Sequence, residues 1–131
     1  MAGDRVPRES DPELSDEPVG SRGAPLLPVI LDVDTGIDDS LALLYARASP
    51  EIAIVAVTCV AGNVGAAEVA RNTRAVLELA GRGEMRVALG ADRPLVKPLE
   101  TAEETHGPEG IGHATLPDPA GALDELDAPS R

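Results

Sequence analysis

The stretch PVILDVDTGIDD (residues 28–39) joins a short apolar run to a turn that holds four aspartates. Residues 29–33 are rich in β-branched side chains and predict a buried strand, which delivers the acidic turn at its carboxyl end. No basic side chain lies within the turn, so its carboxylates repel one another unless a cation neutralises them. Several oxygens on a short turn suit a hard ion such as Ca²⁺ or Mg²⁺. We therefore expect a metal site at this turn.

The rest of the chain alternates between helical and extended patterns. Asp38 or Asp39 stands where a helix N-cap is expected. Residues 52–60 predict a second strand covered on both faces, residues 66–80 a second helix, and residues 86–89 a third strand. The first helix has apolar residues at i, i+3, i+4 and i+7, which predicts a buried face of Leu41, Leu44, Tyr45 and Ala48.

This alternation with short connections predicts an α/β fold with parallel strands. In such sheets ligands bind outside the carboxyl ends of the strands. The acidic turn, the Gly62-Asn63 turn and the loop carrying His106 all leave the strands at that edge. In the second helix we expect Arg71 and Arg74 on a solvated face.

Composition narrows the function classes. The formal net charge of −12 disfavours binding to nucleic acid and to anionic membranes. Cys59 is the only cysteine and lies in an apolar run, which predicts a buried reduced thiol and a cytoplasmic location. Residues 1–25 and 118–131 are polar and acidic, and we expect both to be disordered tails around a folded core of residues 26–117.

Two known acidic motifs do not fit the turn. An EF-hand loop counted from Asp32 needs glycine at its sixth position and a bidentate Glu at its twelfth, where this chain has Ile37 and Leu43. An aspartate-nucleophile phosphatase of the dehalogenase type needs Thr or Val where Gly36 stands. It also leaves the second pair of aspartates without a purpose, so it is the weaker alternative.

A set of motifs resembles the inosine/uridine-preferring nucleoside hydrolases in order and spacing. The set comprises residues 28–39, Val60-Ala61-Gly62-Asn63-Val64, Arg71-Asn72, residues 90–95 and residues 106–112. The resemblance covers about residues 28–117, which correspond to the N-terminal third of a family member. It implies a truncated, Rossmann-like parallel sheet with flanking helices. It also implies hydrolysis of the N-glycosidic bond of a ribonucleoside, with Ca²⁺ as the cofactor.

The resemblance also implies roles for individual residues. Asp34 and Asp39 would be calcium ligands, and Asp34 would take the proton of the attacking water. Asp32 would support the loop from inside. Ribose would be held by Asp38 and Asn63, and the nucleobase or leaving group would be approached by His106.

Two interpretations of different classes follow. The chain is either part of a nucleoside hydrolase that needs the remaining residues for activity, or a non-catalytic remnant that retains a metal-binding turn. In both, the sheet exposes an edge and an apolar face, so we expect self-association or binding to a partner there.

Overall fold

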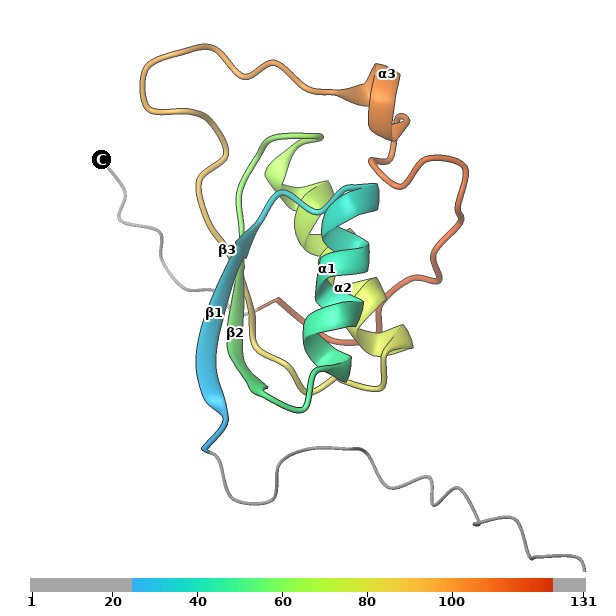
Figure 1. The fold of residues 1–131 in the computed structure, drawn as a ribbon. Helices are drawn as coiled ribbons and strands as arrows, with labels where there is room; N and C mark the ends of the chain where they lie inside the picture. Colours follow the sequence, from blue (N-terminus) through green and yellow to red (C-terminus); the bar gives the residue numbers. More distant parts are fainter. Residues whose placement is uncertain (1–24, 124–131) are drawn as a thin grey trace, which may run out of the picture.

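The structure is a computed structural model that describes residues 25–123, so all but the last residue of the predicted N-terminal tail lies outside it. Its elements follow the predicted alternation, with one short helix in chain that was expected to be irregular (Figure 1). In chain order they are β1 (Leu27–Val33), α1 (Ile37–Ala48), β2 (Ile52–Cys59), α2 (Ala66–Leu79), β3 (Val87–Leu89) and α3 (Glu103–His106).

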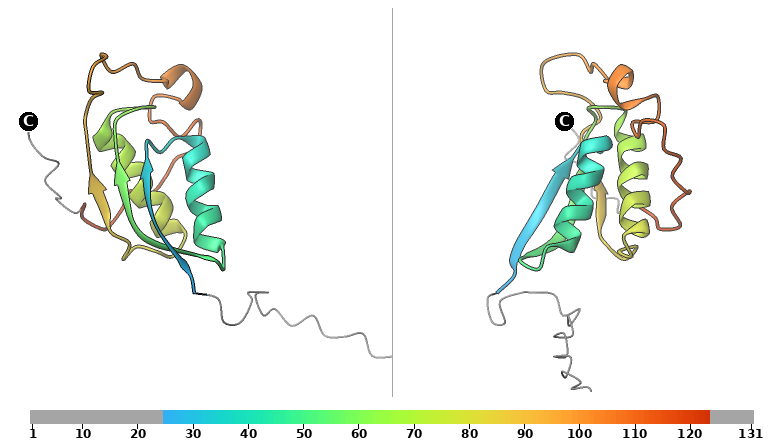
Figure 2. Two further views of the ribbon diagram at one scale, coloured as in Figure 1. Left: turned by 60° about the vertical axis from the view of Figure 1, so that its left-hand side comes forward. Right: turned by 45° about the vertical axis from the view of Figure 1, so that its right-hand side comes forward.

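Within the described residues, the three strands form one parallel sheet in the order β1-β2-β3. Two successive crossovers in the same direction place α1 and α2 on the same face of the sheet (Figure 2). The carboxyl ends of the strands, the first turns of both helices and α3 gather at one end of the molecule (Figure 1). The predicted α/β, Rossmann-like sheet is confirmed.

The core lies between the sheet and the two helices. Strand residues such as Val57 and Cys59 and helix residues such as Leu43, Val69 and Leu77 are all at most 1% exposed. Cys59 is a free, buried cysteine as predicted, and burial raises the pKa of its thiol. No helix among residues 25–123 is long and apolar enough to cross a membrane.

The predicted buried face of α1 is wrong. Leu43 and Ala46 face the core, whereas Leu41 is 64% exposed and Tyr45 77% exposed. Apolar residues occupy almost every position around this helix, so the i, i+3, i+4 spacing fits more than one face. The direction in which α1 leaves β1 decides which face meets the sheet.

The sheet face opposite the helices is open at several apolar positions. Ile30 is 65% exposed and Val55 is 53% exposed, and the pairing of β1 with β2 shifts register beside them, between Val29 and Ile30. The β1 strand also pairs with no second neighbour among residues 25–123. The expected uncovered edge and apolar face are therefore present.

Arg74 does not lie on a solvated face as predicted. Its side chain is 5% exposed, and its guanidinium donates to the carbonyl oxygens of Gly83, Met85 and Ala122. These carbonyls belong to the α2–β3 connection and to the C-terminal segment. Backbone carbonyls that accept from the guanidinium allow the whole side chain to be buried.

The chain beyond Pro117 runs along α2 as far as Leu123. Arg71 forms an ion pair of 2.8 Å with Asp118, and the Glu78 carboxylate accepts the backbone N–H groups of residues 120 and 121. These two hydrogen bonds lower the pKa of Glu78. The tail predicted over residues 118–131 thus contacts α2 in its first six residues, and residues 124–131 lie outside the described chain.

The orientation of α1 can be tested with two truncations of the same chemistry. We expect Leu43→Ala to lower the free energy of unfolding by about 2–5 kcal/mol, because it empties a fully buried site. Leu41→Ala removes an exposed side chain and should change it by less than about 0.5 kcal/mol. Urea unfolding of both variants measures the difference. Equal losses would contradict the observed orientation.

Candidate active site

The acidic turn begins at the residue that follows β1. Asp34 donates its backbone N–H to Oδ2 of Asp39 at 3.0 Å, and Asp39 lies in the first turn of α1. Burial is the main cause that raises the pKa of Asp39, and repulsion from Asp34 and Asp38 adds to it. The structure therefore brings two of the predicted ligands together, and their like charges oppose each other.

The turn after β2 is tied directly to Asp34. The backbone N–H of Asn63 donates to Asp34 Oδ2 at 3.1 Å, and Asn63 Nδ2 donates to the Asp34 carbonyl oxygen at 2.9 Å. The Asn63 carbonyl in turn accepts the N–H of Ala102, just before α3. Asn63 thus joins three segments that are far apart in sequence.

His106 comes from α3 and lies over the start of α1. Its Nδ1 accepts the N–H of Ile37 at 3.2 Å and lies 4.0 Å from Asp38 Oδ1. A ring nitrogen that accepts a hydrogen bond carries no proton, so this bond favours the tautomer with the proton on Nε2. The His106 side chain is 15% exposed and that of Asp38 is 79% exposed, which leaves Asp38 at the rim.

Asp32 has a different position from the other aspartates. Its Oδ1 accepts the hydroxyl of Thr58 at 2.6 Å, across the pairing of β1 with β2 on the open sheet face. Neighbouring side chains in a strand point to opposite faces, and the next residue, Val33, is buried. Asp32 therefore supports the two strands rather than the inside of the turn.

Two glycines allow the close packing of these side chains. A Cβ at Gly62 would overlap the carboxylate of Asp34 and lie 2.7 Å from its Cβ. A Cβ at Gly36 would overlap the ring of His106 and lie 2.7 Å from Asn63 Nδ2. Glycine is required at both positions because side chains of the site occupy the space.

Sequence reasoning gave no role to three buried polar residues beside the site. Thr35, Asn72 and Thr73 are each at most 1% exposed. The available signal was a polar pair on a helix face that otherwise carries Val69, Val76 and other apolar residues. That signal predicts burial but not the partner of each side chain.

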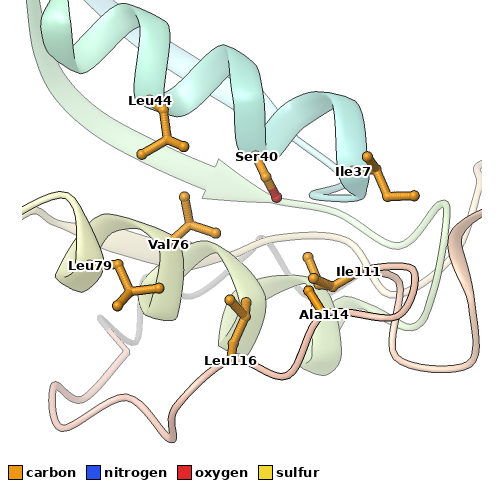
Figure 3. A pocket seen from close by; sticks show the side chains of 8 residues that line it. All are labelled: Ile37, Ser40, Leu44, Val76, Leu79, Ile111, Ala114 and Leu116. Atoms are coloured by element: carbon orange, nitrogen blue, oxygen red, sulfur yellow. The ribbon is translucent and has the colours of Figure 1, made fainter.

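A hollow of about 260 Å³ lies between the two helices and the loop after α3 (Figure 3). Its lining is apolar apart from Ser40, whose hydroxyl donates to the Gly36 carbonyl. The lining residues are Ile37, Ser40, Leu44, Val76, Leu79, Ile111, Ala114 and Leu116. None of the predicted site residues lines it, so it is not the place where the acidic turn would bind a ligand.

The donor set fits part of a calcium shell. Ca²⁺ takes about 6–8 oxygen ligands, and carboxylates are its preferred protein donors. Asp34 and Asp39 supply adjacent carboxylates whose mutual repulsion a cation would relieve. Residues 25–123 contain no group of three or more His, Cys, Asp or Glu placed to hold one ion. The remaining oxygens must come from substrate, water or further protein.

Comparison with known proteins decides the family. The family model described as inosine-uridine preferring nucleoside hydrolase matches residues 29–130. The chain belongs to this nucleoside hydrolase family. The match extends past Pro117, where sequence reasoning saw no family pattern.

Curated nucleoside hydrolases align with only part of their length. The inosine-uridine preferring nucleoside hydrolase of Crithidia fasciculata is 43% identical over 89 residues, which are 68% of this chain and 28% of that protein. The pyrimidine-specific ribonucleoside hydrolase RihA of Enterobacter sp. (strain 638) is 45% identical over 93 residues, 71% of this chain and 30% of that protein. This chain therefore spans less than a third of these relatives.

Solved structures of nucleoside hydrolases share the fold. The purine-preferring ribonucleoside hydrolase from Gardnerella vaginalis has a TM-score of 0.71 at 35% identity, over 76% of this chain and 33% of that one. The plant nucleoside hydrolase PpNRh1 has a TM-score of 0.67 at 35% identity, over 79% of this chain and 33% of that one.

The close approach at Gly62 gives a test of the site geometry. We expect Gly62→Ala to displace the Asp34 carboxylate, break its bond to the Asn63 amide and lower the free energy of unfolding by about 1–3 kcal/mol. Gly65→Ala is the matched control, because a Cβ there meets nothing within 4 Å. Amide hydrogen exchange at Asn63, measured by NMR, should accelerate only in the first variant. Unchanged exchange in Gly62→Ala would contradict the contact.

Proposed function

We propose that this chain is the N-terminal part of an enzyme that hydrolyses the N-glycosidic bond of ribonucleosides to ribose and free base. The main support is the pair of carboxylates, Asp34 and Asp39, at the carboxyl end of β1, with Asn63 hydrogen-bonded to both the backbone and the side chain of Asp34. Family membership gives the reaction class. The names of the relatives include a pyrimidine-specific and a purine-preferring ribonucleoside hydrolase.

Asp34 is proposed as the base that accepts a proton from the attacking water. The Asn63 amide holds its Oδ2 and so orients the carboxylate. Breaking the bond between ribose and base builds oxocarbenium character on the sugar, and nearby carboxylates stabilise that positive charge. A bound Ca²⁺, held by Asp34 and Asp39, would lower the pKa of the attacking water and offset the repulsion between the carboxylates. Attack on the face opposite the base inverts the anomeric centre.

The remaining site residues are proposed to hold the substrate. Asp38 is exposed at the rim, where its carboxylate can accept hydrogen bonds from ribose hydroxyls. Asn63, which is hydrogen-bonded to Asp34 in the same turn, is also proposed to contact ribose. His106 carries its proton on Nε2 in the favoured tautomer, so it can donate to the departing base while Nδ1 stays bound to the start of α1.

Two aspartate variants separate the metal turn from the sheet. We expect Asp34→Asn to abolish Ca²⁺ binding by the chain, measured by isothermal titration, since it removes one of two adjacent carboxylates. Asp32→Asn should keep the wild-type affinity, because Asp32 faces Thr58 on the open sheet face. In a protein that contains the whole domain, Asp34→Asn should also slow release of ribose by about 10²–10⁴-fold. Normal turnover by that variant would exclude Asp34 as the base.

A second candidate is a non-catalytic, metal-binding remnant. It is supported by the finding that residues 25–123 contain no group of three or more Asp, Glu, His or Cys placed to hold one ion. A reducing-sugar assay with a panel of nucleosides, run on a protein that contains the whole domain, distinguishes the two candidates. Ca²⁺ binding by that protein without any release of ribose favours the remnant. We also place the chain in the cytoplasm, supported by its single free cysteine.

We further propose that the open face and edge of β1 mediate association. Ile30 is 65% exposed on the open face of β1, and the other apolar residues of the strand give it the composition of a strand covered on both faces. Analytical ultracentrifugation should show concentration-dependent association of the wild type, weakened at least about tenfold by Ile30→Lys through the cost of burying a charge. Leu95→Lys, at an exposed loop position, is the control. A wild-type monomer at all concentrations would contradict this proposal.

A further inference from the structure

Behind the acidic turn lies a chain of buried hydroxyl groups. Thr35 Oγ1 and Thr73 Oγ1 are 2.6 Å apart, and neither residue is exposed to solvent. Thr35 follows Asp34 directly, and Thr73 lies in the middle of α2. The contact therefore connects the turn to a helix that begins more than thirty residues later in the chain.

The direction of each hydrogen bond follows from the protons available. The Thr73 hydroxyl donates its single proton to the carbonyl oxygen of Val69 at 2.8 Å. Its oxygen therefore accepts from Thr35, and it also accepts from the Cys59 thiol at 3.4 Å. One donated and two accepted bonds use the full capacity of a hydroxyl group. Thr35 is thus the donor of the hydrogen bond to Thr73 in the arrangement that satisfies all three bonds of the Thr73 hydroxyl.

The neighbouring residue of α2 holds the other part of the site. Asn72 Nδ2 donates to the carbonyl oxygen of Glu109 at 2.6 Å, in the loop that follows His106. That loop turns back through Gly110, where φ is +79° and a Cβ would lie 3.1 Å from the Val64 side chain. The Asn72 side chain is 1% exposed, so water does not compete for this bond.

We propose that Asn72 and Thr73 are positioning residues that set the acidic turn and the His106 loop in register with each other. These two consecutive residues of α2 bind two loops that are far apart in sequence: Thr73 binds the acidic turn and Asn72 binds the loop after His106. Together with the hydrogen bond from the Ile37 N–H to His106 Nδ1, they hold the acidic turn and the His106 loop in one arrangement. This inference rests on the proposed function only in its consequence, which is that the metal turn and the leaving-group histidine act on one substrate.

The proposal predicts separate effects for the two residues. In Thr73→Val the turn loses its anchor, so amide exchange at Asp34 and Asn63 should accelerate about tenfold relative to Val57 in the sheet. Exchange at Gly112, whose N–H donates to the His106 carbonyl, should stay unchanged in that variant. In Asn72→Ala, amide exchange at Gly112 should accelerate about tenfold, and exchange at Asp34 and Asn63 should stay unchanged.

Conservative variants and a titration complete the test, all on the full chain. Thr73→Ser keeps the hydroxyl and should restore the wild-type exchange at Asp34 and Asn63, and Thr35→Val should reproduce the effect of Thr73→Val from the other end of the bond. Uniform acceleration that includes Val57, no acceleration in either valine variant, or failure of serine to restore protection would each overturn the proposal.

Ca²⁺ titration of the same variants separates this proposal from the proposed function. We expect Thr73→Val to weaken calcium affinity about tenfold while Thr73→Ser keeps it. If the wild type itself binds no calcium, the metal assignment fails, and the exchange pattern still decides whether Asn72 and Thr73 position the two loops.

Discussion

The parallel pairing of β1 with β2 is the interaction on which the site depends. It runs from Leu27 opposite Ile52 to Val33 opposite Cys59, and the Val60 N–H extends it to the Val33 carbonyl. This register brings the residue after β1 beside the turn after β2, where Asn63 reaches Asp34. Because side chains alternate along a strand, a slip of one residue would turn Val33 out of the core and bring Asp32 into it.

The acidic turn places charges where the fold can partly offset them. Asp38 and Asp39 lie in the first turn of α1, where the exposed N–H groups of the helix favour negative charge. Backbone N–H groups also reach the carboxylates of Asp34 and Asp39. Burial is the main cause that raises the pKa of Asp39, the N–H group of Asp34 lowers it, and repulsion from Asp34 and Asp38 raises it further. The fold can therefore form with the carboxylates adjacent and still favour a cation between them.

The strands, the parallel sheet and the meeting of Asp34, Asp39 and Asn63 at one edge followed from the sequence. They depend on local patterns and on a general rule of α/β sheets, which sequence alone contains. The buried face of α1 did not follow, because its apolar residues surround the helix. Arg74 was misjudged for a different reason, since the carbonyls that bind it belong to chain up to 48 residues away. The partners of Thr73 and Asn72 were hidden for the same reason.

Asp32 has a consequence for whatever covers the open side of the sheet. Its carboxylate accepts a hydrogen bond from the Thr58 hydroxyl. It lies on the sheet face that exposes the apolar side chains of Ile30 and Val55. A layer that packs there without a hydrogen-bond donor would remove water from the Asp32 carboxylate, and this desolvation would weaken the packing. The Asp32 carboxylate therefore disfavours non-specific association between sheets. It favours a packing layer that places a hydrogen-bond donor opposite Asp32.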